Sequence, residues 1–450
     1  MYSKKIDSIL KRKGIKIGSR VTLEKDGKVY EGLLMPKTEV GDPDCLVLKL
    51  DNGYNIGIEV RGSVKIAKSK DSGVKYGSYE LGKIKKGLIK VDFDKKRPKV
   101  SMVATGGTVA SRIDYKTGGV TGMMNPKEFL HNVPELANII NLKRIVCPFT
   151  KMSEDMGSED WQTLAKTVAR ELNSGSKGVI LTHGTDTLHF TSAALSFFLR
   201  GLTKPVVLLG SQRSSDRGSS DAGMNLICAS HAASGGIAGV NVCMHGTMND
   251  DYCILTRGTR VRKMHTSRRD AFRPINEPPL AKIWPNGRIE HTNRYYTPRQ
   301  EGKVTPDLKF EPKVALIKTY PGSDPGIIDY YLGKKYKGFV IEGMGLGHVP
   351  TLARKSWTAK IKKAVRKGIP VVVTSQTIYG RVNPNVYSNL RILYHESGAI
   401  PGEDMLSETA YVKLGWVLGH TKKPEKIREM MLTNYAGEIT ERTLPEAFLY

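Results

Sequence analysis

Two loops that contain glycine and threonine, each directly after a short apolar run, most constrain the fold of this chain. The first, Thr105–Thr108, follows Lys99–Ala104, and the second, Thr182–Thr187, follows Gly178–Leu181. Each apolar run has the length of a buried parallel strand, and open α/β sheets bind ligands at the carboxyl ends of such strands. Glycine lets the backbone approach a ligand closely, and hydroxyls supply nucleophiles and donors. We therefore predict one site built from both loops.

Length and composition favour a multidomain α/β protein. At 450 residues the chain is too long for one ordinary core, so we expect two or three domains. It has no apolar run of about 18 residues, as a membrane span requires. Its basic first 16 residues lack the apolar segment of a signal peptide. We therefore expect a cytoplasmic protein with no membrane partner.

The cysteines show no pattern of a metal site. The chain has five, with no paired spacing: Cys45, Cys147, Cys228, Cys243 and Cys253. An odd number in a cytosolic chain indicates reduced, mainly buried thiols. We therefore predict no metal in this chain.

Positive charge is the second large signal. The net charge is +26, and the first 100 residues hold 24 Lys and Arg against 13 Asp and Glu. Such an excess favours polyanions, of which nucleic acid is the usual one. A basic, solvated surface explains it equally well, so the charge permits a polyanionic partner without identifying one.

The first 70 residues have the pattern of a small β-barrel. About five short apolar runs lie between residues 21 and 68, with turn signals at Asp26-Gly27 and Asn52-Gly53. We predict an SH3-like or Sm-like barrel over residues 1–70, which either binds RNA or packs as a spacer. Residues 71–98, rich in Lys, Gly and Ser, are predicted to form a linker.

From Lys99 onward, apolar strands alternate with helical patterns, which predicts parallel sheets covered by helices. The expected elements are helices at 161–172 (with Ser158 as N-cap), 190–200, 221–233, 355–367, 404–418 and 425–432, and strands at 178–181, 205–209, 239–244, 313–318, 338–342 and 369–374. A polar, proline-containing break covers residues 285–312. We therefore predict a large domain over 99–300 that carries the catalytic loops and a C-terminal α/β domain over 313–450.

Thr108 is the candidate nucleophile, although a turn or helix-cap hydroxyl is the simpler role for an isolated threonine. Its hydroxyl needs a base, and Asp186 with Lys263 offers a proton relay if the surroundings favour the neutral amine. Arg260 and Arg262 are near enough in sequence to supply the cation that would do so. The alternative for Lys263 is a surface cation.

His183 suits either a general base or a structural hydrogen-bonding role, and we favour the second. Gly343–Gly347 is glycine-rich, but its spacing and the missing acidic residue exclude a dinucleotide site. The chain also lacks the GxxxxGK[ST] phosphate-binding loop. We therefore expect no nucleotide to bind by either route.

The motifs together resemble the asparaginase family. Thr105–Ala110 resembles its first signature and His183–Thr187 its second, while Gly210–Arg213 and Gly343–Pro350 match in order. The resemblance covers the chain from Lys99 to the carboxyl end. It implies a two-domain asparaginase-like fold of parallel sheets flanked by helices.

The resemblance also implies roles for site residues. Thr108 would attack the side-chain carbonyl of the substrate and form an acyl-enzyme, while Tyr115 would close over it from a loop. Thr185, Asp186 and Lys263 would form a second catalytic group that guides water for deacylation.

Substrate binding would fall to Ser153, Glu154 and Asp186, which would hold the α-carboxylate and α-ammonium groups. The carboxylates of Glu154 and Asp186 are suited to pair with the positively charged α-ammonium group. Many family members carry glutamine where this chain has Glu154, so the preference between asparagine and glutamine stays open.

The N-terminal barrel, which precedes the asparaginase-like region, indicates a narrower group within this family. With Asp114–Gly119, Ser153–Met156 and Gly402–Leu406, the chain is similar to the glutaminase subunits of archaeal glutamyl-tRNA(Gln) amidotransferases. This implies that it releases ammonia from glutamine and that a partner subunit, using ATP and magnesium, amidates Glu-tRNA(Gln). It also implies a heterotetramer with two copies of each subunit and no cofactor in this chain.

Two alternatives stay open. The first is a stand-alone L-asparaginase with an appended β-barrel, which would turn over asparagine without tRNA or partner. The second is a catalytically silent RNA-binding scaffold. The presence of Thr108, Thr185, Asp186 and Lys263 together argues against the silent scaffold, because an inactive descendant need not keep all four.

Overall fold

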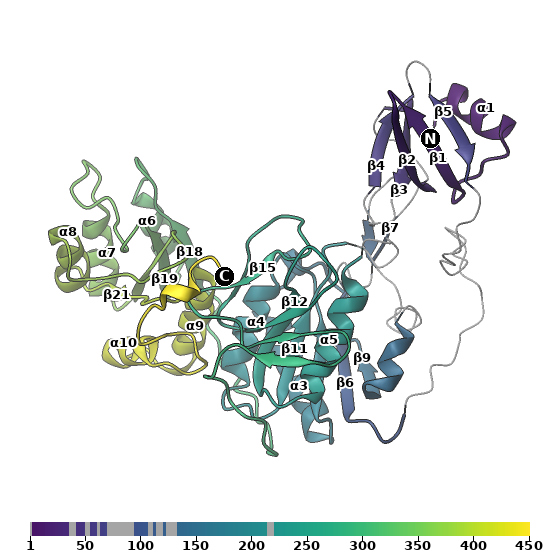
Figure 1. The fold of residues 1–450 in the computed structure, drawn as a ribbon. Coiled ribbons are helices and arrows are strands. Elements are labelled where there is room, and N and C mark those ends of the chain that lie inside the picture. The colour runs from purple at the N-terminus through teal and green to yellow at the C-terminus, as the bar shows by residue number, and fades with distance from the viewer. Residues whose placement is uncertain are drawn as a thin grey trace. The chain divides into compact units, whose positions relative to one another are not determined.

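The computed structural model describes residues 2–35, 42–49, 55–60, 64–69, 94–106, 111–113, 120–122, 133–213 and 220–450. The chain divides into two compact units. The N-terminal unit comprises 1–91, 108–134 and 211–223, and the main unit comprises 92–107, 135–210 and 224–450. Figure 1 shows the ribbon of both. Most of the linker predicted over 71–98 lies outside the described residues, which include only its last five.

The N-terminal unit contains the small antiparallel β-domain that the sequence predicts. Its sheet has the order β4-β3-β2-β1-β5. The strands are β1 (Arg20–Lys25), β2 (Lys28–Leu34), β3 (Cys45–Lys49), β4 (Asn55–Glu59) and β5 (Lys65–Lys68). Asp26 and Gly27, with φ of 51° and 69°, form the two-residue turn between β1 and β2, as their sequence predicts. The second predicted turn, Asn52-Gly53, lies outside the described residues.

A helix that the sequence analysis missed completes this domain. In α1 (Lys4–Arg12), Ile6 and Leu10 are buried in one core with strand residues such as Leu23 and Leu48. Its three apolar residues, Ile6, Ile9 and Leu10, have helical spacing, but the sequence analysis assigned no helix to this basic segment. A hairpin of β7 (Ser111–Ile113) and β8 (Val120–Gly122) also belongs to this unit.

The main unit is built on an eight-stranded sheet with the order β17-β16-β13-β12-β11-β10-β6-β9. Its strands are β6 (Lys99–Ala104), β9 (Asn141–Val146), β10 (Gly178–Thr182), β11 (Pro205–Leu209), β12 (Gly239–His245), β13 (Cys253–Arg257), β16 (Ala281–Ile283) and β17 (Ile289–His291). The five strands from β9 to β12 are parallel, but β13, β16 and β17 run antiparallel. The sheet is therefore mixed rather than wholly parallel, because the connection over 246–252 is too short for a parallel crossover.

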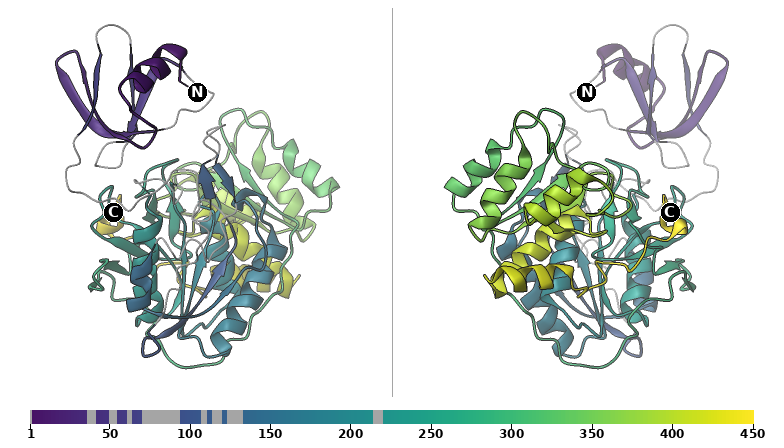
Figure 2. Two further views of the ribbon diagram at one scale, coloured as in Figure 1. Left: turned by 90° about the vertical axis from the view of Figure 1, so that its right-hand side faces the viewer. Right: turned by 90° about the vertical axis from the view of Figure 1, so that its left-hand side faces the viewer.

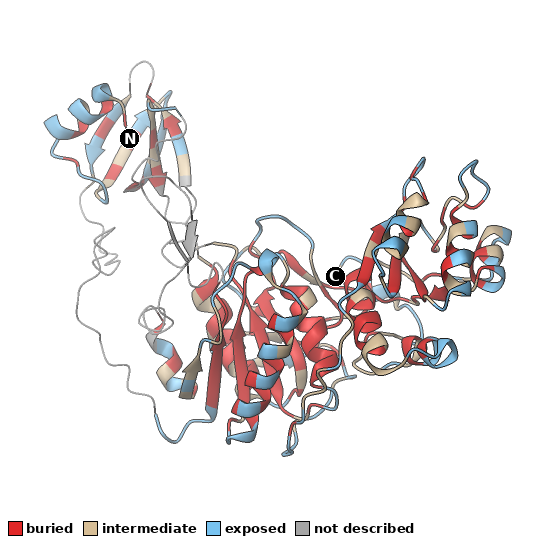
Figure 3. Ribbon diagram, turned by 180° about the vertical axis from the view of Figure 1, so that it is seen from behind, coloured by how far each residue is buried: buried red, intermediate tan, exposed pale blue. Residues whose placement is uncertain are grey.

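Helices cover this sheet, whose strands are largely buried in Figure 3. They are α3 (Ser158–Asn173), α4 (Leu188–Phe198) and α5 (Ala222–Ser234). Of these, α3 packs on β6 and β10, and α4 packs on β11 and β12. The expected N-cap was wrong by one residue. Ser158 is the first helical residue, and Gly157 is the cap, whose N–H donates to the Asp160 carboxylate (2.9 Å).

The C-terminal part of the main unit has a four-stranded parallel sheet. Its elements are β18 (Val314–Lys318), β19 (Gly338–Gly343), β20 (Val371–Ser375), β21 (Ile400–Pro401), α6 (Gly326–Gly333), α7 (Trp357–Arg366), α8 (Ser388–Arg391), a π-helical turn (Ile392–Glu396), α9 (Ser407–His420) and α10 (Pro424–Leu432). Figure 2 shows α9 and α10 in yellow-green. Because α9 packs on α4 as well as on β18 and β19, it joins this sheet to the larger one.

Short segments complete the described chain. They are the hairpin β14 (Val261–Lys263) and β15 (Phe272–Pro274) and the 3-10 turns Pro134–Asn138, Ser153–Asp155 and Pro445–Ala447. Among the residues that the structure describes, no helix has both the length and the apolar character to cross a bilayer.

Candidate active site

Three predicted site residues meet at the carboxyl end of β10. Lys263 comes from β14, and its Nζ donates to Thr185 Oγ1 (2.9 Å) and to Asp186 Oδ1 (2.7 Å). The Lys263 side chain is 11% exposed, whereas that of Asp186 is 64% exposed. The structure therefore joins a buried hydroxyl, a nearly buried amine and a carboxylate that faces solvent.

This arrangement can move a proton. A neutral amine in hydrogen-bond contact with a hydroxyl can accept its proton, and the resulting ammonium is stabilised by the adjacent carboxylate. Lys263 is thus placed to activate Thr185 or a water beside it. These contacts differ from those of a free surface cation, the alternative that the sequence left open for Lys263.

The two predicted loops begin side by side. β6 pairs with β10, so that Ala104 lies opposite Thr182, and the hydroxyl of Thr105 donates to the Thr182 carbonyl (3.0 Å). Gly106 has φ of +101°, and an added Cβ would lie 3.0 Å from a neighbouring carbonyl oxygen, so the loop requires glycine there. The next loop residues, Gly107 to Ala110, lie outside the described residues, and Thr108 is among them.

Tyr115, the predicted loop residue, also lies outside the described residues. The predicted substrate-binding residues do not. Ser153 is buried and Glu154 exposed, both in one 3-10 turn. That turn is attached to the loop after β10, because the Thr187 hydroxyl donates to the Ser153 carbonyl (2.6 Å). The exposed Glu154 carboxylate on this turn suits an ammonium group of a ligand.

His183 has a structural place, as the sequence analysis favours. Its Nδ1 bonds the Gly184 carbonyl (2.7 Å), and its Nε2 lies 2.9 Å from Thr191 Oγ1, which accepts from Trp161 Nε1. A carbonyl only accepts, so these partners assign the proton to Nδ1. Complete burial lowers the pKa of His183 to about 4. The imidazole is therefore neutral, with both nitrogens used.

Sequence reasoning misplaced the two arginines near Lys263. The Arg260 guanidinium lies against Asp404 (3.1 Å) and that of Arg262 against Glu408 (3.0 Å), so each is neutralised by a carboxylate rather than aimed at the lysine. These partners are more than 140 residues away in the chain, and no local pattern indicates them.

The described residues include no cluster of three His, Cys, Asp or Glu side chains that could hold a metal. All five cysteines are free; Cys228, Cys243 and Cys253 are buried, whereas Cys147 is exposed.

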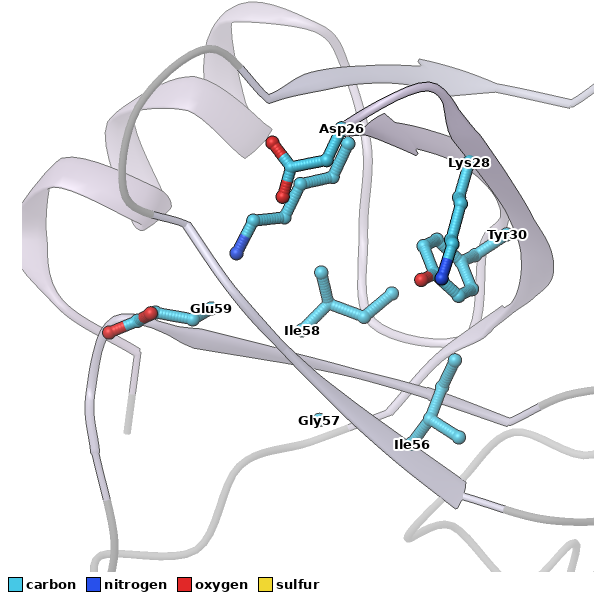
Figure 4. A pocket seen from close by; sticks show the side chains of 8 residues that line it. Asp26, Lys28, Tyr30, Ile56, Gly57, Ile58 and Glu59 are labelled. Carbon is cyan, nitrogen blue, oxygen red and sulfur yellow. The ribbon is translucent and has the colours of Figure 1, made fainter.

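A separate hollow of about 510 Å³ lies on the β-domain (Figure 4). The residues that line it are Lys25, Asp26, Lys28, Tyr30, Ile56, Gly57, Ile58 and Glu59. This lining includes two lysines and two carboxylates, so the hollow itself does not favour a polyanion.

Comparison with known proteins gives consistent matches over the whole chain. Three family models match: "GatD N-terminal domain" over residues 15–68, "Asparaginase, N-terminal" over 99–296 and "Glutaminase/Asparaginase C-terminal domain" over 313–431. A glutamyl-tRNA(Gln) amidotransferase subunit of Pyrococcus abyssi is 51% identical, with 99% of this chain and 100% of that protein covered. The corresponding subunit of Thermococcus kodakarensis is 50% identical, with 99% of each covered.

Among solved structures, the thermostable L-asparaginase of Thermococcus kodakarensis is similar, with a TM-score of 0.67 and 32% identity. The match covers 76% of this chain and 99% of that enzyme. A probable cytoplasmic L-asparaginase of Campylobacter jejuni matches with a TM-score of 0.62 and 26% identity. The two-domain asparaginase-like fold predicted from the sequence is confirmed.

Proposed function

Because this chain belongs to the GatD family of glutamyl-tRNA(Gln) amidotransferase subunits, we propose that it hydrolyses glutamine to glutamate and ammonia through a threonine acyl-enzyme. The ammonia passes to a partner subunit, GatE, which uses ATP and magnesium to convert Glu-tRNA(Gln) into Gln-tRNA(Gln). Two copies of each subunit form the assembly. The observation that carries the hydrolytic part is the contact of Lys263 with both Thr185 and Asp186.

In the first step, the Thr108 hydroxyl oxygen attacks the side-chain carbonyl carbon of glutamine, and the hydroxyl proton passes to a base. The tetrahedral oxyanion is stabilised by backbone N–H groups of the glycine loops, each worth about 3 kcal/mol. Its collapse breaks the C–N bond, and the nitrogen takes a proton and leaves as ammonia. An ester of Thr108 with the glutamate side chain remains.

In the second step, water attacks that ester. Lys263 is held between Thr185 and Asp186, and it removes a proton from Thr185 or from the water that is hydrogen-bonded to Thr185. It then returns a proton to the Thr108 oxygen. Cleavage of the ester bond releases glutamate and restores the Thr108 hydroxyl.

Substrate orientation falls to the residues around this centre. The carboxylates of Glu154 and Asp186 pair with the α-ammonium, and the Ser153 hydroxyl donates to the α-carboxylate. Tyr115 closes over the bound substrate, and hydrolysis without partner and tRNA is slow because this closure is incomplete.

A stand-alone L-asparaginase is the second candidate. The observation in its favour is that 99% of the Thermococcus kodakarensis L-asparaginase is covered by this chain. That match covers only 76% of this chain, so it leaves the N-terminal β-domain without a role.

The test is ammonia release from glutamine and from asparagine. The purified chain is assayed alone, and then with GatE, Glu-tRNA(Gln), ATP and magnesium. We expect glutamine turnover to rise sharply only with the complete set. Equal turnover under both conditions, with asparagine preferred, would instead establish a free asparaginase.

Two variants test the assigned residues in the same assay. Thr108→Ala and Lys263→Met should each lower kcat by roughly 100-fold or more, because each removes a group that takes part in bond making or proton transfer. Lys166→Met, at an exposed position of α3, is the matched control and should keep wild-type activity. Full activity of Thr108→Ala would exclude the acyl-enzyme.

A further inference from the structure

The segment that leads into Lys263 is held by the C-terminal part of the main unit. Thr259 is fixed through both of its polar groups. Its hydroxyl donates to the Ala436 carbonyl (3.0 Å), and its carbonyl accepts from the Thr409 hydroxyl (3.0 Å). The backbone therefore has a defined position four residues before Lys263.

The next residue is held as well. Arg260 is fully buried, and its guanidinium donates to the carbonyls of Gly437 (2.9 Å) and Asp404 (2.9 Å). The Asp404 carboxylate also lies 3.1 Å away. These contacts fix the base of β14, but they do not reach the end of the strand, where Lys263 stands.

The backbone of β14 is paired with β15, where Lys263 lies opposite Phe272, and Arg262 supplies the ion pair nearest to Lys263 on this strand. Its Nη2 lies 3.0 Å from Glu408 Oε1, in the first turn of α9. Successive side chains of a strand point to opposite faces, so Arg262 and Lys263 face opposite sides of β14. The Arg262–Glu408 pair therefore holds one face of β14, and Lys263 reaches Thr185 and Asp186 from the other.

Among the residues that the structure describes, Arg262 is the only charged cation paired with Glu408. The Glu408 side chain is 8% exposed, and its Oε2 has no hydrogen-bond partner within this described part of the chain. His189 Nε2 is 3.8 Å away, but burial lowers the pKa of His189 to about 3, so that ring is neutral. Burial also raises the pKa of Glu408, and the Arg262 guanidinium acts in the opposite direction. A buried carboxylate with one cationic partner holds that partner firmly.

We infer that Glu408 is a positioning residue, which acts through Arg262 to keep the Lys263 amine in contact with Thr185 and Asp186. This inference rests on the proposed function, because Lys263 matters only if the relay is used. It assigns an indirect role in the chemistry at Lys263 to a side chain of α9.

The experiment measures glutamine-dependent ammonia release by the complete complex with Glu-tRNA(Gln), ATP and magnesium. For Glu408→Gln, kcat should fall roughly 10- to 100-fold, because a displacement of about 1 Å at a catalytic group has that effect. KM should stay within about twofold, since substrate-holding residues are unchanged. Arg262→Gln should lower kcat by about the same factor as Glu408→Gln. The double variant should have a kcat no lower than that of either single variant. Glu408→Asp, which keeps the charge, should recover part of the rate.

Glu403→Gln is the matched control. It removes the 2.6 Å ion pair between Glu403 and Arg381, on the same stretch of chain, and should keep the wild-type kcat. Wild-type kcat in Glu408→Gln, or fully additive losses in the double variant, would overturn the inference.

A crystal structure of the Glu408→Gln complex separates this inference from the proposed function. If the wild type releases no ammonia from either amide, the proposed function fails, but the structure still decides the positioning. We expect Lys263 Nζ to lie beyond hydrogen-bond distance of Thr185 Oγ1. An unchanged contact would overturn the inference whatever the activity.

Discussion

His183 shows how one side chain fixes the loop that presents Thr185 and Asp186. Both ring nitrogens are used within the fold, one toward Gly184 and one toward Thr191. A protonated ring would place an N–H against a hydroxyl that is already held by Trp161, and it would bury a charge. The loop is therefore built around a neutral imidazole.

This predicts loss of stability in mild acid. The pKa of His183 is lowered to about 4 in the fold, below its ordinary value of 6.5. The unfolded chain therefore takes up this proton first. The stability that the neutral ring contributes is complete above pH 6.5 and is lost as the pH falls toward 4. Between these two pH values, the contribution of His183 to the free energy of unfolding falls by up to about 1.4 kcal/mol per pH unit.

Urea unfolding between pH 8 and 5 checks this prediction. The free energy of unfolding should be flat down to pH 6.5 and then decline. His183→Gln should start lower but decline less steeply below pH 6.5. The control is His395→Gln at the exposed His395. The prediction is wrong if both variants show the same decline as the wild type.

Single residues divide clearly into those that the sequence could indicate and those that it could not. Asp186 and Lys263 stood out because their residue types imply proton chemistry, Thr185 was indicated by the resemblance to the asparaginase family, and the structure brings the three together. Glu408 gave no signal, because a carboxylate in the first turn of a helix is ordinary. Only folding brings it against Arg262.

At the scale of elements, the strand ends are packed closely enough that one methyl group should disturb the site. Gly210 follows β11, and an added Cβ would lie 2.7 Å from Thr185 Cγ2 and 3.0 Å from the His183 carbonyl oxygen. Neither atom belongs to the far end of a flexible side chain. Thr185 therefore has to move if Gly210 gains a side chain.

Gly210→Ala should therefore lower the kcat of ammonia release roughly tenfold or more, with the protein still folded. Gly236→Ala is the control, since a Cβ there meets nothing within 4 Å. Activity and the thermal midpoint of both variants are compared in the complete complex. Wild-type kcat in Gly210→Ala would show that the loop yields without affecting Thr185.

Partial burial or short length explains several of the strands that the sequence patterns missed. The central strands were located well, and the prediction of 205–209 coincides with β11, because strands covered on both faces are continuous apolar runs. β9, at the edge of the sheet, is only half-buried and reads as mixed polar sequence. The three-residue strands β14 to β17 are too short to show any period.

For the whole molecule, the loop after α10 links the chain's end to the catalytic half. Its Ala436 and Gly437 carbonyls accept from Thr259 and Arg260, two residues that lie 177 positions earlier. No sequence pattern predicts a pairing at that separation. The predicted division into a large domain and a C-terminal domain therefore does not indicate how closely the main unit joins them.

A buried ion pair holds this loop, and its removal should weaken the entire main unit. Lys413 Nζ lies 2.6 Å from Glu438 Oε1, and both side chains are fully buried. Glu438 also accepts the N–H groups of Tyr435 and Ala436, so it shapes the loop directly. Burial lowers the pKa of Lys413, and the Glu438 carboxylate opposes that shift. Without the carboxylate, a cation would stay buried against carbonyl oxygens alone.

Glu438→Gln should therefore destabilise the protein by about 3–5 kcal/mol, the usual cost of breaking a buried ion pair on one side. Lys413→Met combined with Glu438→Gln should recover much of that loss, because the double variant leaves no unpaired charge. Thermal unfolding followed by circular dichroism measures both, with the exposed Glu425→Gln as the control. Because the same loop holds Thr259 and Arg260, ammonia release in Glu438→Gln should fall at temperatures below the unfolding transition. An unchanged midpoint would show that the loop is held by its backbone contacts alone.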